Sequence, residues 1–234
     1  MCNLYTTLDG DEILRYFRRE PPRRDYKPAI GPLQDGPFIR AGGEVVVGQW
    51  GLIPSPSPTR TPSTPDGKRR LSTNNCRREG MARSYAFGPS WRAGRRCLIP
   101  AWAFVEPYYA PGAAKSVRWQ FARADGQPWA LAGLWNEWTD HHSGEIVPSY
   151  TMITQNCDDH PLLKLMHKPE LDEAGQLLAV QDKRTVVPIE QAHWDTWLHG
   201  SADEVEALIV VPELGLFEHG AMNPAQQMFL PITL

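Results

Sequence analysis

The second residue of the chain is a cysteine, and Met1 is expected to be removed because the residue after it is small. Cys2 would then carry a free amine and a thiol on adjacent carbons. The amine, whose ordinary pKa is about 7.7–8.0, is partly neutral near pH 7 and can add to an aldehyde to give an imine. The thiol can then close on the imine carbon as a five-membered thiazolidine ring. The same thiol could instead attack an amide with the amine as base, or Cys2 could pack as a small apolar residue.

A single carboxylate interrupts an apolar stretch later in the chain. Residues 97–109, with the sequence CLIPAWAFVEPYY, have the pattern of a strand whose one charged residue is Glu106. A carboxylate on an apolar strand suits proton transfer in both directions of a reaction. The alternative is a buried structural carboxylate that accepts hydrogen bonds from backbone amides.

Positive charge is concentrated in the first half of the chain. Residues 1–100 hold 17 Lys and Arg against 9 Asp and Glu, whereas residues 101–234 hold 7 against 18. Six arginines crowd one short stretch: Arg77, Arg78, Arg83, Arg92, Arg95 and Arg96. Guanidinium groups match the geometry of phosphate oxygens, so this stretch predicts an anion-binding surface. The alternative is a solvated basic face.

Length and composition favour one globular domain over residues 1–234, although two small domains would also fit. The chain has no run of about 18 apolar residues and no basic, apolar start, so we expect neither a membrane span nor a secretory signal. The cysteines, Cys2, Cys76, Cys97 and Cys157, lack the CxxC spacing of metal or redox sites. We therefore expect free thiols, no metal, no cofactor and a cytoplasmic protein.

Several elements must position these groups. The pattern predicts a helix over 9–20, a buried strand over 44–50 and an exposed, proline-rich loop over 51–70. Strand-like runs between 116 and 156, joined by turns at Asp125-Gly126 and His142-Ser143-Gly144, predict an antiparallel meander. Further helices are expected through 162–167, at 189–198 and at 202–209, before a strand-like C-terminal end. The expected fold is α+β, a mostly antiparallel, barrel-like β-sheet with peripheral helices.

Short motifs recur along nearly the whole chain. They are MC at the start, WGLIP at 50–54, Asn75-Cys76-Arg77-Arg78-Glu79, RRCLIPA at 95–101 followed by Phe104-Val105-Glu106, and then Asn156, His167, KRTVV at 183–187 and WDTWL at 194–198. Each motif is weak alone, but their order and spacing resemble the SOS-response-associated peptidase family. Members of that family shield abasic sites in single-stranded DNA.

The resemblance implies roles for four residues. Cys2 would be the residue that forms the crosslink, and Asn75 would orient the opened sugar or the N-terminus. Glu106 would shuttle protons, and His167 would assist ring opening. These residue types suit the chemistry, since an abasic sugar is mostly a closed hemiacetal and an imidazole titrates near neutral pH. The alternative for His167 is a structural imidazole that bonds a carbonyl at a helix end.

The resemblance also implies a surface for DNA. Arg77 and Arg92 fall where the family places arginines that contact phosphates, and Trp50 could wedge or stack against a base beside the lesion. The partner would be single-stranded DNA that contains abasic sites, within the nucleoid, with no membrane contact and no obligate protein partner.

The chain departs from the family pattern at several positions. Asn3 and Leu4 replace the Gly and Arg that commonly follow MC. The sequence Thr73-Asn74-Asn75 leaves Asn74 as a second candidate for the asparagine. Around His167 the usual His-x-Arg-Met-Pro is absent, which leaves His160 as a competitor.

Three functions remain open from the sequence. The first is a DNA-repair protein that forms a covalent thiazolidine with abasic single-stranded DNA and reverses it later. The second is an amide-cleaving N-terminal nucleophile enzyme or peptidase. The third is a non-catalytic module that binds single-stranded DNA, in which Cys2 is incidental. The basic first half favours the first and third functions, and the separate Glu106 and His167 favour the first and second.

Overall fold

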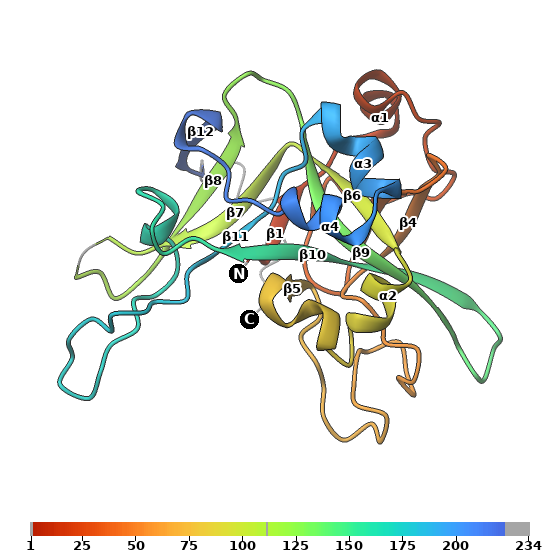
Figure 1. Ribbon diagram of the computed structural model, residues 1–234, viewed down its shortest axis with the longest axis horizontal. Coiled ribbons are helices and arrows are strands. Elements are labelled where there is room, and N and C mark those ends of the chain that lie inside the picture. The colour runs from red at the N-terminus through yellow and green to blue at the C-terminus, as the bar shows by residue number, and fades with distance from the viewer. Residues whose placement is uncertain (1, 111, 223–234) are drawn as a thin grey trace.

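Two β-sheets form the body of the protein in the computed structural model, which describes residues 2–110 and 112–222 (Figure 1). The five-stranded sheet has the order β12 (Phe217–Ala221), β8 (Val117–Arg123), β7 (Ala103–Tyr108), β1 (Leu4–Thr6) and β2 (Ala29–Ile30). The seven-stranded sheet has the order β11 (Arg184–Val186), β10 (Ile146–Asn156), β4 (Val45–Trp50), β3 (Asp35–Arg40), β6 (Arg96–Ala101) and β9 (Trp129–Thr139), with β5 (Asn75–Arg77) beside β10.

An additional pairing between β9 and β10 closes the larger sheet. Strands β10, β4, β3, β6 and β9 thereby form a ring in which each strand bonds the next. Most pairs are antiparallel, and β10 pairs in parallel with β4 and with β5. The expectation of a mostly antiparallel, barrel-like sheet with peripheral helices is confirmed.

Alternating side chains on the barrel strands divide the core into two clusters. On β6, Cys97 and Ile99 join an inner, aromatic-rich cluster, whereas Leu98 between them joins an outer cluster. This follows from the two-residue period of a strand, which sends successive side chains to opposite faces. The inner cluster also contains Cys2, and the outer cluster packs beneath helices.

The helices are short and lie outside the sheets (Figure 1). Helix α1 (Gly10–Phe17) begins at a capping box in which Asp9 and Glu12 bond each other's backbone N–H groups, and α4 (Ala202–Ala207) begins at a similar box. The others are α2 (Gly88–Arg92), α3 (Trp194–His199) and the 3₁₀ turns η1 (Arg78–Arg83), η2 (Leu163–Leu165), η3 (Gln191–His193) and η4 (Leu214–Leu216). Phe17 of α1 stacks on Trp194 of α3, which joins two segments far apart in the sequence.

The structure corrects three expectations about these elements. Residues 97–109 are two strands, because at Trp102 the chain leaves the barrel: β6 pairs with β3 and β9, whereas β7 pairs with β1 and β8. The predicted meander is interrupted for the same reason, since β8 lies in the smaller sheet and β9 in the barrel. The helix expected through 162–167 is only the turn η2, because Met166 bridges to Tyr108 and the His167 N–H donates to the Pro107 carbonyl.

The remaining expected elements agree with the structure in position. The strand expected over 44–50 is β4, and the helix expected over 9–20 is the shorter α1. The C-terminal strand is β12, and the residues after Met222 lie outside the described part of the chain. Among the residues described, none of the helices reaches the length and apolarity needed to span a bilayer.

Candidate functional site

Cys2 lies two residues before β1 and is fully buried in the inner cluster. Strand β1 pairs with β7 so that Leu4 faces Val105, which brings the first residues of the chain beside Glu106. The Cys2 thiol donates to the Leu4 carbonyl at 3.2 Å and lies 3.9 Å from the Val105 carbonyl oxygen. The pairing of β1 with β7 therefore brings Cys2 and Glu106, which are 104 positions apart in the chain, close together.

Two side-chain amides hold the backbone of Cys2. Asn75 Nδ2 donates to the Cys2 carbonyl at 2.7 Å, and Asn74 Nδ2 donates to the same oxygen at 3.2 Å. They reach it because β5 begins at Asn75 and lies parallel to β10. Both asparagines that the sequence left open therefore bind the N-terminal segment.

The environment of the Cys2 thiol keeps it protonated. Burial raises the pKa of this thiol far above its ordinary value, and the negative charge of Glu106 raises it further. A thiolate is therefore not the resting form near pH 7. This favours a sequence of steps in which the amine reacts first and the thiol later gives up its proton.

Glu106 and His167 form a close pair. The His167 Nε2 lies 2.9 Å from a carboxylate oxygen of Glu106. The Glu106 side chain is 1% exposed and that of His167 is 21% exposed, so the imidazole lies between the buried carboxylate and the outside. Such a carboxylate–imidazole pair can accept a proton at one step and return it at another.

The backbone at His167 is held in an unusual conformation. Its φ angle is 63°, in the left-handed region that non-glycine residues seldom adopt. On one side the His167 N–H donates to the Pro107 carbonyl at 2.6 Å. On the other, the ammonium of Lys183 donates to the carbonyls of His167 and Lys168 at 3.1 and 3.0 Å. Lys183 is almost fully buried, so this cation fixes the peptide that carries the imidazole.

We expect Lys183→Met to slow any reaction that uses His167. Methionine keeps an unbranched stem but cannot donate to the two carbonyls, so the left-handed backbone loses its anchor. Misplacing a catalytic group in this way costs about 10- to 10²-fold in rate. The measurement is the single-turnover rate together with the titration curve of the His167 imidazole by NMR. Lys164→Met, which changes an exposed lysine of η2, is the matched control. Wild-type rates and titration in folded Lys183→Met would contradict the assignment.

His160, the competitor, is engaged elsewhere. Its Nδ1 accepts from the backbone N–H groups of Leu162 and Leu163 at 3.2 and 3.0 Å, and its ring packs edge-on against Phe217. Burial lowers the pKa of His160, which keeps the ring neutral. The geometry therefore brings His167, and not His160, to Glu106.

Three neighbours of the site were not identified from the sequence. Cys157 lies close enough that, after burial, the charge of Glu106 helps to raise the pKa of its thiol to about 12. Asp158 accepts from the backbone N–H groups of residues 181–183 and so shapes the loop that carries Lys183. Asp182 pairs with two arginines. The sequence signals beside these residues are Asn156, which precedes Cys157 and Asp158, and the KRTVV motif, which begins directly after Asp182.

Arg77 is exposed at the edge of the site. Its guanidinium pairs with Asp182 at 2.8 Å, and its side chain is 53% exposed. Asp182 also pairs with the buried Arg184, which in turn pairs with Glu79 at 2.6 Å. Since Arg184 is enclosed and Arg77 is open to solvent, Arg77 is the member of this network that an incoming anion can reach.

The other two predicted DNA contacts differ in exposure. Arg92 is exposed and donates to the Ala82 carbonyl at 2.6 Å, which ties α2 to η1. Trp50 is fully buried, donates to the Asn74 carbonyl at 2.8 Å and meets Tyr5 edge-on. A buried ring has no face for a base to stack on, so the stacking role expected for Trp50 is wrong in this structure. Trp50 instead supports the peptide that carries Asn74.

Some of the crowded arginines are structural. Arg96 is buried and donates to the carbonyls of Trp197 and Gly200, and Arg78 bonds Glu206 and the Ile209 carbonyl.

Within 2–110 and 112–222, no three His, Cys, Asp or Glu side chains gather as a metal site would require.

The fold and these residues define a protein in which the carbonyl of the buried Cys2 is held by two side-chain amides beside a carboxylate–imidazole pair. Residues 1–218 match the family described as SOS response associated peptidase (SRAP), and the chain belongs to that family.

Named relatives share part of this sequence. The chain is 32% identical over 121 residues to the abasic site processing protein HMCES of Xenopus tropicalis, covering 45% of this chain and 35% of the relative. It is 27% identical over 178 residues to the protein of the same name from Gallus gallus, covering 62% and 52%. The matched region is therefore between about a third and a half of these relatives' length.

Solved structures match over nearly the whole chain. A protein from Bordetella bronchiseptica has a TM-score of 0.79 at 30% identity, covering 95% of this chain and 100% of that one. A protein from Bacteroides thetaiotaomicron has a TM-score of 0.74 at 16% identity, covering 97% and 94%, and supports the fold alone.

Proposed function

We propose that this protein processes abasic sites by linking Cys2 covalently to the opened sugar in single-stranded DNA. Family membership and the names of its relatives support the substrate. The observation that carries the chemistry is the convergence at the N-terminus. Two asparagines hold the Cys2 carbonyl, and β7 places Glu106, paired with His167, next to the same residue.

The reaction begins at the sugar. The His167 imidazole takes the proton of the C1 hydroxyl of the deoxyribose and returns a proton to the ring oxygen, which breaks the bond between that oxygen and C1 and releases the aldehyde. The amine nitrogen of Cys2 then bonds the aldehyde carbon, and the carbinolamine loses water after Glu106 protonates its hydroxyl. The amine must be free for this step, so it requires the removal of Met1, a residue that lies outside the described part of the chain.

The thiol completes the adduct. The Cys2 sulfur bonds the imine carbon, the C=N double bond becomes a single bond, and the proton of the thiol reaches the nitrogen by way of Glu106. The product is a thiazolidine, and no external oxidant or reductant is needed. Each step is reversible, so the same carboxylate would serve the opening of the ring.

The binding surface extends from Arg77. A phosphate of the strand beside the lesion would replace Asp182 as the partner of the exposed guanidinium, since both present oxygens in the geometry that arginine prefers. Arg92 remains a second candidate, with an exposed side chain on α2.

Arg77→Ala should weaken binding to all single-stranded DNA alike and leave the reaction at saturating DNA unchanged. Loss of one phosphate contact makes the slope of log K against log salt shallower by about 0.7 for a single strand. Fluorescence anisotropy over a salt series measures both quantities. Arg15→Ala, an exposed arginine of α1, is the control and should keep the wild-type slope. An unchanged slope in Arg77→Ala would show that this arginine only anchors Asp182.

A denaturing gel tests the proposal as a whole. Protein lacking Met1, verified by mass spectrometry, is mixed with single-stranded DNA that carries one abasic site, and with the same strand lacking it. A heat-stable shifted band with the first strand alone is expected. Absence of any covalent species would favour the non-catalytic module. Cleavage of a peptide substrate that depends on Cys2, without a shifted band, would favour the amide hydrolase.

A further inference from the structure

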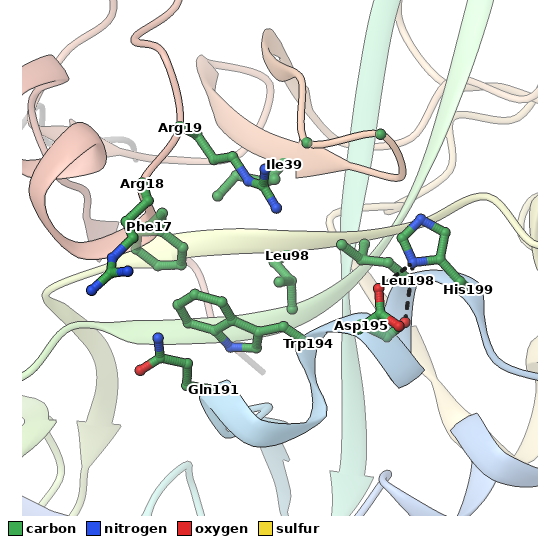
Figure 2. Close-up of a pocket in the computed structure, with 12 residues that line it drawn as sticks. Phe17, Arg18, Arg19, Ile39, Leu98, Gln191, Trp194, Asp195, Leu198 and His199 are labelled. Carbon is green, nitrogen blue, oxygen red and sulfur yellow. Dashed lines mark hydrogen bonds and ion pairs between the residues drawn. The ribbon is translucent and has the colours of Figure 1, made fainter.

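A pocket of about 550 Å³ lies where the end of α1, the turn after β3, strand β6 and helix α3 meet (Figure 2). Its apolar floor consists of Phe17, Ile39, Leu98, Trp194 and Leu198, all of which belong to or pack against the outer cluster. Cys2 lies in the inner cluster, on the other side of the barrel wall. The pocket therefore is not part of the site described above.

The floor of this pocket is rigid and apolar. Phe17 and Trp194 stack with ring centroids 4.7 Å apart and planes within 8° of parallel. The indole N–H of Trp194 donates to the Ile189 carbonyl at 2.9 Å, which fixes the ring. Leu98 is 1% exposed and comes from a barrel strand. Such a floor accepts a bulky apolar group with little loss of side-chain freedom.

The rim of the pocket is basic. Arg18 ends α1 with a φ of 54°, and the chain then leads into Arg19, whose guanidinium reaches over the cavity (Figure 2). A Cβ atom at Gly43 would lie 2.5 Å from an Arg19 nitrogen, so this glycine lets the guanidinium lie against the backbone. Within the described residues, the side chains of Arg18, Arg19 and Arg23 make no ion pair. A groove that continues the pocket past Arg23 runs along Val45–Val47 of β4.

We propose that this pocket and groove bind an acidic peptide segment of a partner protein. One bulky apolar side chain of the peptide fills the pocket, and carboxylates beside it bond Arg18 and Arg19. The charges are complementary, and Arg–carboxylate pairing supplies both orientation and affinity. Because the pocket lies on the other side of the barrel wall from Cys2, a peptide bound there would leave the Cys2 site open to DNA.

A peptide fits this surface better than a nucleic-acid strand. Bases bind single-strand sites by stacking on open aromatic faces, and here Phe17 and Trp194 cover one face of each other. Glu20 and Glu44 lie along the groove and Asp195 lies at the rim, where they would repel a continuous row of phosphates. A peptide with spaced carboxylates can avoid these positions.

Fluorescence anisotropy with a labelled peptide whose aspartates are separated by glycines and whose last residue is phenylalanine tests the proposal on the full chain. We expect binding that weakens with salt, a loss of about fivefold with Arg18→Ala or Arg19→Ala, and a loss of about tenfold when alanine replaces the phenylalanine of the peptide. Arg69→Ala, an exposed arginine outside the groove, should leave the affinity unchanged. The indole N–H resonance of Trp194, assigned by its disappearance in Trp194→Phe, should shift on titration.

Three results would overturn the proposal. The first is no binding at about 1 mM peptide, where even weak docking would be seen. The second is binding that both arginine substitutions leave intact. The third is displacement of the peptide by an equal concentration of undamaged single-stranded DNA, which would assign the groove to nucleic acid. Because the readout is binding of a peptide, failure here is separate from failure of the crosslinking reaction.

Discussion

Cys2→Ser is expected to abolish the heat-stable adduct with abasic DNA while leaving strand binding intact. Serine keeps the amine and nearly the size of the side chain, so an imine can still form, but the hydroxyl is a far weaker nucleophile than sulfur. Any residual species should therefore be an imine, visible on a gel only after reduction with borohydride. A protein that retains Met1 should fail as well, because its Cys2 nitrogen is an amide.

Cys76→Ser is the matched control for this result. Cys76 is a second fully buried thiol and lies on β5, but it carries no free amine. The folded Cys76→Ser variant should react at the wild-type rate. The melting temperatures of Cys2→Ser and Cys76→Ser show whether a lost reaction reflects a loss of folding. Borohydride-independent crosslinking by Cys2→Ser at the wild-type level would reject the thiazolidine mechanism.

Glu106→Gln is expected to slow both the formation and the reversal of the adduct, each by about 10²-fold. Glutamine keeps the shape but cannot exchange a proton, and one acid–base group serves a step in both directions. His167→Ala should slow formation by a similar factor on a natural abasic site and leave the completed adduct unchanged. Single-turnover rates and the decay of purified adduct measure the two directions.

A modified substrate separates the two roles. An oligonucleotide with an acyclic aldehyde in place of the deoxyribose needs no ring opening, so it should restore most of the rate of His167→Ala and none of the rate of Glu106→Gln. Because His167 Nε2 lies 2.9 Å from a Glu106 carboxylate oxygen, each substitution also changes the contact between the two side chains. Wild-type rates in both folded variants would show that the pair is structural. Cys2, Asn74 and Asn75 would then be the remaining candidates for catalysis.

The sequence predicted the parts of the site that depend on residue type. The N-terminal position of Cys2, the lone carboxylate of an apolar strand and the order of the family motifs all led to residues that the fold brings together. It also predicted strands such as β4, where a continuous apolar run is bounded by turns.

What the sequence could not predict depends on contacts between distant segments. Nothing local distinguishes Trp50 as a buried support, because burial depends on Asn74 and Tyr5. The left-handed backbone of His167 and its anchor at Lys183 also arise from packing against β7, which overrides the helical pattern of 162–167. Likewise, the break between β6 and β7 is fixed by their strand partners, which no local pattern reveals.

The burial of the Cys2 sulfur also affects how readily this sulfur is oxidised. Peroxides oxidise thiolates far faster than thiols, and an oxidised sulfur could no longer close a ring on the imine carbon. Burial raises the pKa of this thiol, and the negative charge of Glu106 raises it further, so the sulfur keeps its proton near pH 7. For a Cys2 that reacts with abasic sites as proposed, burial would therefore keep the sulfur in the less oxidisable thiol form until an aldehyde has reached the amine beside it.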